Sequence, residues 1–175
     1  MKKIFLLFLP VFISFSSFCQ KFESAREYND FVILQQEVIM VDLISYTHVM
    51  QATTNYDTLR SGLDNLIKIT EISLSNVKKA TPYSGGKELK NAVIDLFTFY
   101  IKAFKNEFSE MIKVLSKAQI TEADAIKVQQ LADKVAEDEK KYDDAFQKAQ
   151  NKFAADNNLE IVPNQLQKEI DELNK

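Results

Sequence analysis

Hydrophobic residues recur at alternating steps of three and four along four long stretches of the chain, which is the spacing of helices that bury one face. The stretches cover about residues 24–53, 55–79, 87–118 and 121–156. The first carries a row through Phe31, Gln35, Val38, Asp42, Ser45, Val49 and Ala52, which Val32, Ile39 and Tyr46 widen. The second carries Tyr56, Leu59, Leu63, Leu66, Thr70, Leu74 and Val77 on one face. The third carries the widest apolar row, through Leu89, Val93, Leu96, Tyr100, Phe104, Glu107, Met111, Val114 and Ala118. No strand pattern competes with these helical patterns, so the chain is expected to be all-α.

The segments between these stretches carry helix-ending and helix-starting signals. Pro82 disfavours helix in the residue before it, and Gly85 and Gly86 permit left-handed turns. Thr121, with acidic residues directly after it, is typical of a helix N-cap. Connections of a few residues make neighbouring helices antiparallel, so we expect an up-down-up-down four-helix bundle. The alternative is two long helical hairpins that associate through a partner chain.

The two ends of the chain differ from this pattern. Residues 1–19 read as a signal peptide, with a positively charged start, an apolar core and small residues at its end. The bundle is expected over residues 20–156. Residues 157–175 form a tail, in which Leu166, Ile170 and Leu173 recur at helical spacing and predict a short C-terminal helix.

The residues at the end of the signal peptide decide whether the mature protein is released by cleavage or anchored by a lipid. Ser17 and Cys19 fit the small residues that signal peptidase requires, which predicts a mature chain that starts at Gln20. The alternative is a lipoprotein anchored through Cys19, but Phe18 is a large neighbour for that processing. The chain is therefore expected to be exported, as a periplasmic, secreted or cell-surface protein with no transmembrane segment after cleavage.

Composition excludes several classes of function. There are only three Gly, three Pro and one Cys, so a Gly-rich phosphate loop and a disulfide framework are absent from the sequence. Cleavage after Cys19 leaves 20 basic residues against 25 acidic ones, a net charge of −5. No basic patch exists, so we expect no nucleic-acid partner.

The residue types that carry common chemistry are scarce. The single histidine, His48, is expected on the surface of the first helix. The Glu-x-x-His pairs of di-iron bundles do not occur, and the mature chain lacks the usual ligands of haem and structural zinc. We therefore expect no cofactor and no enzymatic activity.

Three carboxylates interrupt the predicted apolar rows: Asp42, Glu107 and Glu139. Counting along antiparallel helices places them near one level of the bundle. They are a candidate polar layer for a cation or a small polar ligand, and oxygen ligands alone would favour Ca²⁺ or Mg²⁺. The simpler interpretation is that they face water, pair with Lys or fix the register of the helices.

Some apolar residues lie off the predicted rows, namely Ile33, Met40, Ile44, Ile72 and Phe99. A wider core or a docked tail would cover them. The other interpretation is a contact surface for a protein partner or a second copy of the chain.

The segment that contains Tyr28, Asn29 and Asp30, followed by an apolar pair and a Gln, resembles the opening helix of a family of uncharacterised exported bacterial surface proteins. The leader ending in Phe-Cys-Gln is similar to those of exported Bacteroidota proteins. The resemblance implies export and a helical bundle, and it implies no activity. We therefore expect a non-enzymatic binding or interaction module of the cell envelope, with a ligand-binding polar layer as the alternative.

Overall fold

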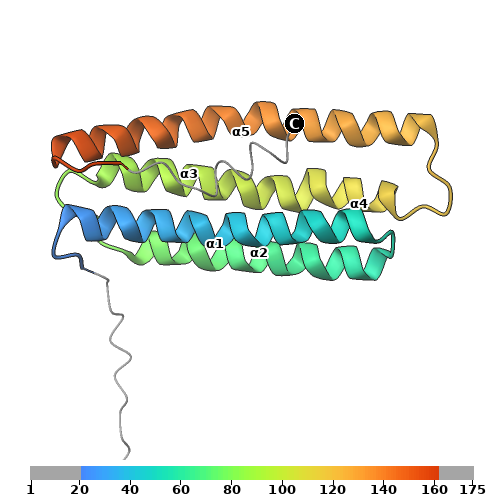
Figure 1. Cartoon of the computed structure of the whole chain (residues 1–175), viewed down its shortest axis with the longest axis horizontal. Helices are drawn as coiled ribbons and strands as arrows, with labels where there is room; N and C mark the ends of the chain where they lie inside the picture. The colour runs from blue at the N-terminus through green and yellow to red at the C-terminus, as the bar shows by residue number, and fades with distance from the viewer. Residues whose placement is uncertain (1–20, 162–175) are drawn as a thin grey trace, which may run out of the picture.

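The computed structural model describes residues 21–161, which are helical without any strand (Figure 1). The helices are α1 (Ala25–Ala52), α2 (Tyr56–Lys79), α3 (Lys87–Ala103), the π-helical turn η1 (Phe104–Phe108), α4 (Ser109–Leu115) and α5 (Glu122–Asp156). Because α3, η1 and α4 are continuous, four rods pack together, which confirms the all-α bundle. The predicted signal peptide and tail helix lie outside the described residues.

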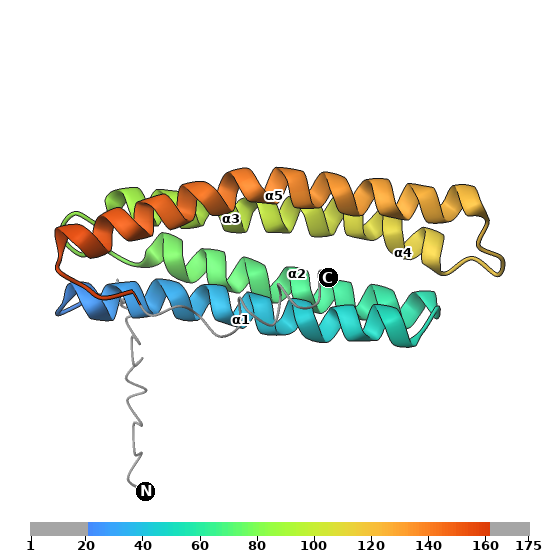
Figure 2. The same cartoon turned by 45° about the horizontal axis from the view of Figure 1, so that its top comes forward.

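The bundle consists of two helical hairpins packed as two layers. One layer is α1 with α2, the other is α3–η1–α4 with α5, and α2 lies against α3 to join them (Figure 2). On the remaining side, α1 and α5 meet near one end, where the ring of Tyr28 lies edge-on to Phe153 at 5.5 Å and Gln150 donates to Asn29. Consecutive rods are antiparallel, as the short connections require.

Three of the four rods, all except the one that begins with α3, start at a side chain that accepts a backbone N–H group. Ser24 Oγ accepts from the Glu27 amide at 3.1 Å, and Asn55 Oδ1 accepts from the Thr58 amide at 2.9 Å. Thr121 and Asp124 form a reciprocal capping box. These contacts satisfy amides that have no partner within the helix, so each start is fixed by local sequence.

The core is formed by apolar side chains from all four rods. Its largest fully buried members include Tyr28, Val32, Ile39, Leu59, Leu63, Leu66, Val77, Leu89, Leu96, Phe97, Phe104 and Ile112. Most of those on α2 and α3 belong to the rows predicted from sequence. Phe104 is fully buried, as expected, and its ring stacks at 6.1 Å from that of Tyr100.

The buried face of α1 differs from the prediction. Val38 and Ser45 were expected in the buried row, but both are exposed, and the row runs through Tyr28 with Ile39 and Tyr46, which were expected only to widen it. The tyrosines explain the rotation, because each buries a large ring and still finds an acceptor for its hydroxyl. Tyr28 donates to the Gly86 carbonyl at 3.3 Å and Tyr46 to the Leu59 carbonyl at 3.1 Å.

The third rod also departs from a plain α-helix. It was predicted as one helix over residues 87–118, but η1 interrupts it and it ends at Leu115. A π-turn holds one more residue than an α-turn and so displaces the side chains that follow. Ser109 Oγ donates to the Phe104 carbonyl at 3.3 Å, across the wide turn.

The α4–α5 hairpin is longer than its neighbour. In both views the loop between α4 and α5 reaches beyond the loop between α1 and α2 (Figures 1 and 2). The apolar residues along the first half of α5, such as Val128 and Leu131, are therefore only half-buried. Among residues 21–161, no helix is both long enough and apolar enough to cross a membrane.

Candidate functional site

Asp42, the first residue of the predicted polar layer, lies at the seam between α1 and α2. Its carboxylate oxygens accept from Asn65 Nδ2 at 3.3 and 3.4 Å. Partial burial raises the pKa of Asp42, and the hydrogen bond from Asn65 partly offsets that rise. Because α1 is rotated relative to the prediction, Asp42 lies beside α2 rather than in the centre of the bundle.

Glu107 lies in the π-turn and faces α5. Its Oε1 is 2.6 Å from Nζ of Lys134, which also pairs with Asp138 at 3.1 Å. The carboxylate is therefore used in an ion pair between the third and fourth rods. Exposed pairs of this kind contribute little to stability, about 0–1 kcal/mol each.

Glu139 is the one member of the predicted layer that meets the aromatic core. The buried Tyr100 donates its hydroxyl hydrogen to Glu139 Oε1 at 3.0 Å. Burial raises the pKa of Glu139, and the hydrogen bond from Tyr100 opposes the rise. Burial, followed by the nearby charge of Glu139, also raises the pKa of Tyr100 well above its usual value.

Sequence reasoning did not single out Asp143, which lies one helical turn after Glu139. Its carboxylate is half-buried and accepts from Gln147 Nε2 at 2.6 Å. Burial raises the pKa of Asp143. Its position four residues after Glu139 was the available signal, because side chains at that spacing share a helix face.

The structure gives Asp42, Glu107 and Glu139 three separate partners. Between residues 21 and 161, no group of three or more His, Cys, Asp or Glu residues is arranged to hold a metal ion. The geometry thus does not bring together the predicted polar layer. The cause is the rotation of α1 for Asp42 and the ion pair with α5 for Glu107. His48 is exposed, as expected.

A shallow hollow beside the π-turn was also missed by sequence reasoning. Charged residues, including Lys105, Glu107, Glu110 and Lys113, surround it, and Leu131 of α5 contributes an apolar wall. All four charges form ion pairs, Lys105 with Glu71 at 2.6 Å among them. The hollow therefore presents a neutralised surface and no group poised for a ligand.

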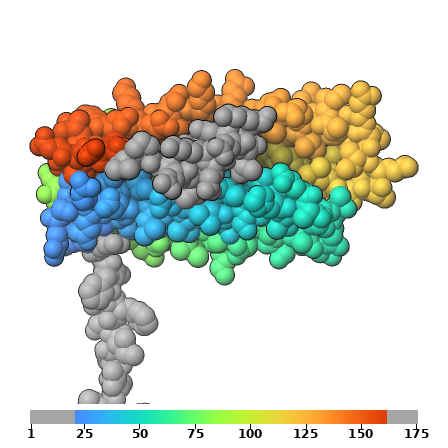
Figure 3. All heavy atoms as spheres, in the orientation of Figure 1, coloured from blue at the N-terminus to red at the C-terminus, as the bar shows by residue number. Residues whose placement is uncertain are grey.

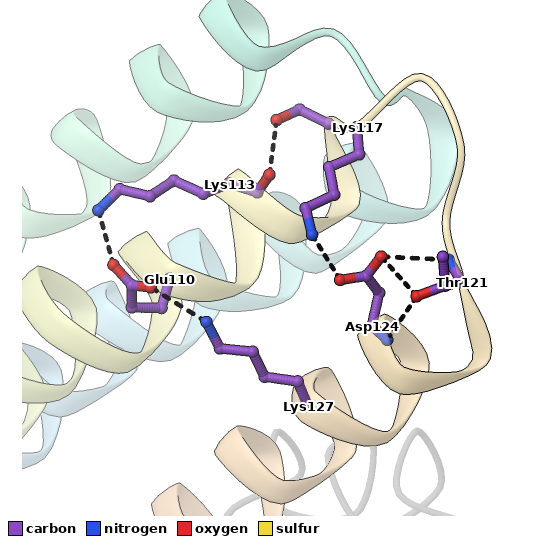
Figure 4. Close-up of polar contacts among 7 residues, drawn as sticks. Glu110, Lys113, Lys117, Thr121, Asp124 and Lys127 are labelled. Atoms are coloured by element: carbon purple, nitrogen blue, oxygen red, sulfur yellow. Dashed lines mark hydrogen bonds and ion pairs between the residues drawn. The ribbon is translucent and has the colours of Figure 1, made fainter.

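The end of the α4–α5 hairpin is held by a network of charges (Figure 4). Glu110 accepts from Lys113 at 2.6 Å and from Lys127 at 3.4 Å, and these contacts lower its pKa. Asp124 accepts from Lys117 at 2.5 Å and from Thr121, which lowers its pKa to about 2. These contacts connect α4, the loop and α5, so this network stabilises the hairpin.

The outer face of α1 carries an apolar surface that we name the α1 ridge. It consists of Leu34, Val38 and Val41 of α1 with Ile72 of the adjacent α2, whose exposed fractions are 53%, 44%, 55% and 50%. The space-filling view shows α1 at the surface of the molecule, below α5 (Figure 3). Singly exposed apolar residues are common, but several on one face mark contact sites.

The α1 side of the α1 ridge is poor in charge. The chain has no Lys or Arg between Arg26 and Arg60, and the only carboxylates from Val32 to Ala52 are Glu37 and Asp42. The outer face of α5, by contrast, is dense with Lys, Glu and Asp. A helix that is apolar on nearly all sides is normally buried on more than one side. The second side of α1 is open among the described residues.

The off-row residues, for which a wider core and a contact surface were both considered, divide into two groups. Met40 and Phe99 are buried, and the Phe99 ring stacks on Tyr142 at 4.9 Å, as the wider-core interpretation predicted. Ile33 and Ile44 are half-buried, and Ile72 belongs to the α1 ridge. The core therefore covers Met40 and Phe99, whereas Ile72 stays exposed beside Leu34, Val38 and Val41.

The chain matches no protein-family model, no curated protein and no solved structure.

Proposed function

We propose that this protein is an exported, non-enzymatic helical module of the bacterial cell envelope that binds a protein partner through the α1 ridge. The observation that carries the proposal is the row of half-exposed aliphatic side chains, Leu34, Val38 and Val41, on a helix whose opposite face is fully packed in the core. Covering these side chains removes apolar area from water, the main favourable term in protein association.

The chemistry of the ridge supports a protein partner over a charged ligand. Its members are aliphatic, and the oxygens of the polar side chains beside them already accept hydrogen bonds within the protein, Gln35 Oε1 from Asn76 and Asp42 from Asn65. Aliphatic centres with a polar rim are the usual anatomy of protein interfaces. The leader sequence supports export, so the partner would be another protein of the envelope.

A photo-crosslinking amino acid placed at Val41 in cells that export the protein tests this proposal. We expect a covalent product with a protein, either a second copy or another chain. The matched control is the same amino acid at Ile126, which is equally exposed but lies on the charged face of α5. The product should disappear when Val38 is replaced by Lys. If Val41 and Ile126 give the same products, or none, the α1 ridge is not a binding surface.

A further inference from the structure

We propose that the occupant of the α1 ridge is a second copy of this chain, bound through its own α1 in the antiparallel direction. This inference rests on the proposed function and deepens it by naming the partner. The interface is two-fold symmetric, so the same residues contribute from both copies.

The spacing along α1 is that of a coiled-coil seam. Residues Phe31, Leu34, Val38, Val41, Ser45, His48 and Ala52 follow one another at alternating steps of three and four. A row with a mean period of 3.5 residues packs against a partner helix with the same row, each side chain filling a gap between four of the other. Inside the protein, the buried row through Val32, Ile39 and Tyr46 packs on the core. Phe31, at the start of the second row, is half-buried against Phe22, so the second row from Leu34 onward remains for an outside helix.

The neighbouring helix widens the row into a patch. Gln35 is bonded to Asn76 and Asp42 to Asn65, so α1 and α2 run antiparallel with these residues level. Counting inward from the two bonds places Val38 level with residues 69–73 of α2, a span that contains Ile72. The apolar patch is therefore centred near the middle of α1, where a two-fold axis would pass.

The polar residues beside the row favour self-association and set its direction. In a parallel pair, Glu37 of one copy would lie opposite Asp42 of the other, and the two carboxylates would repel. In an antiparallel pair centred between Ile39 and Met40, Leu34 and Val38 of one copy face Ser45 and Val41 of the other. Gln35 follows Leu34 and Asp42 follows Val41 on the same edge of this interface, so Gln35 lies beside the second copy's Asp42. The oxygen of Gln35 accepts from Asn76, so its NH₂ group can donate to that carboxylate.

The α1 ridge also differs from the rest of the surface in its lack of charge. A two-fold contact places a patch against itself, so a patch of one sign opposes its own association. The α1 ridge is aliphatic and has no Lys or Arg on its helix from Glu27 to Ala52. It is therefore compatible with a second copy of itself.

The mass of the purified protein in solution tests the inference. Sedimentation equilibrium of the exported protein should give a dimer at micromolar concentration. Val38→Lys and Val41→Lys should each weaken the dimer at least tenfold, whereas Ile126→Lys, the matched substitution on α5, should leave it unchanged. Circular dichroism of each variant at a concentration where the wild type is also monomeric should show the same helix content and melting temperature, because the replaced side chains are exposed and dimerisation no longer adds to the stability of the wild type.

Disulfide trapping tests the direction, in a Cys19→Ser background where introduced thiols are the only ones. An antiparallel pair brings residue 34 of one copy next to residue 45 of the other. Mixing Leu34→Cys with Ser45→Cys should therefore give a cross-linked dimer on oxidation, and each variant alone should not. Rapid cross-linking of either variant with itself would show a parallel pair and overturn the antiparallel assignment.

A monomer at all accessible concentrations overturns self-association. The crosslinker at Val41 then distinguishes the two proposals. Capture of a different envelope protein, lost in Val38→Lys, leaves the binding function standing and removes only the second copy. A monomer that also captures nothing overturns both. A dimer that persists in Val38→Lys and in Val41→Lys forms elsewhere and equally contradicts the inference.

Discussion

The hydroxyl of Tyr100 on α3 donates a 3.0 Å hydrogen bond to Glu139 of α5 and so places a carboxylate against the aromatic core. Replacing Tyr100 with Phe keeps the ring but removes the donor. A buried acceptor left without its partner costs about 1–3 kcal/mol, so Tyr100→Phe should lower the free energy of unfolding by that amount. Urea denaturation measures it, with Tyr142→Phe as a control, because no hydrogen bond to the Tyr142 hydroxyl is seen among the described residues. Equal stability of Tyr100→Phe and the wild type would contradict the prediction.

Stability should fall as pH rises through the titration of Glu139. Burial raises its pKa in the folded protein, so between the unfolded and folded pKa values the folded state binds more protons. The contribution of Glu139 to stability is thus largest below the unfolded pKa, near 4.3, and declines until the folded pKa is passed. Glu139→Gln should flatten this decline. Asp143 contributes with the same sign because its pKa is also raised, so a Glu139→Gln/Asp143→Asn pair should flatten it further. Melting temperatures across pH 4–8 that coincide for all three proteins would contradict the assignment.

Truncating Phe104 in the aromatic core should cause a large loss of stability. Phe104 is fully buried and lies edge-on to Phe108 at 5.2 Å, at the start of the π-turn. Phe104→Ala should lower the free energy of unfolding by about 3–5 kcal/mol. Ile126→Ala, on the exposed face of α5, should change it by no more than about 0.5 kcal/mol. A loss below about 1 kcal/mol for Phe104→Ala would mean that this ring is not in the core.

Two adjacent glycines at the start of α3 should differ in how much their replacement lowers stability. A Cβ on Gly86 would lie 2.6 Å from Cε1 of the buried Tyr28 and 2.9 Å from the Tyr83 carbonyl oxygen, so one of them must move. Gly86→Ala should therefore cost about 1–3 kcal/mol. Gly85 has a φ of +77° and open space around it, so Gly85→Asn, which tolerates that conformation, should be nearly neutral. Thermal melts of the two variants check the order.

Divalent cations should not change the melting temperature. Asp42, Glu107 and Glu139 each have a separate partner, so a cation has no shared site to fill. Melts in EDTA and then in excess Ca²⁺ or Mg²⁺ should coincide. A rise on adding the cation that vanishes in the Asp42→Asn/Glu107→Gln/Glu139→Gln protein would restore the polar layer, because a ligand that binds the folded state raises its stability.

The sequence predicted the rods well because their signals are local. Ser24, Asn55 and Thr121 fix the helix starts through their own backbone neighbours, and Pro82 with Gly85 ends the second rod. The buried face of α1 was harder, because apolar residues cover most of that helix and a row through Val38 competes with one through Ile39. Only the partners of Tyr28 and Tyr46 decide between them, and these lie far away in the sequence.

The candidate site was harder to predict, because the positions of its side chains depend on departures from regular helix that the spacing of apolar residues does not reveal. Glu107 was assigned to the core by extending a 3.6-residue period through the π-turn, which the pattern of residues 104–108 does not reveal. Glu139 interrupts a predicted row and does lie toward the bundle, where α3 and α5 are both regular, but its bond with Tyr100 was not predicted. Of the α1 ridge, Val38 was assigned to a core row and Ile72 to the off-row residues, whereas Leu34 and Val41 were in neither set.

The order in which the helices touch bears on how the chain reaches its folded state. Each rod packs mainly on the next one in sequence, and the sequence-distant contacts of Asn29 with Gln150 and Tyr28 with Phe153 lie at one end. Loops that close early are short, so most native contacts form without a large loss of chain entropy. Folding can therefore advance from hairpin to hairpin on a submillisecond to millisecond timescale. The pairing of the first and last helices would be the final event and the first to open in hydrogen exchange.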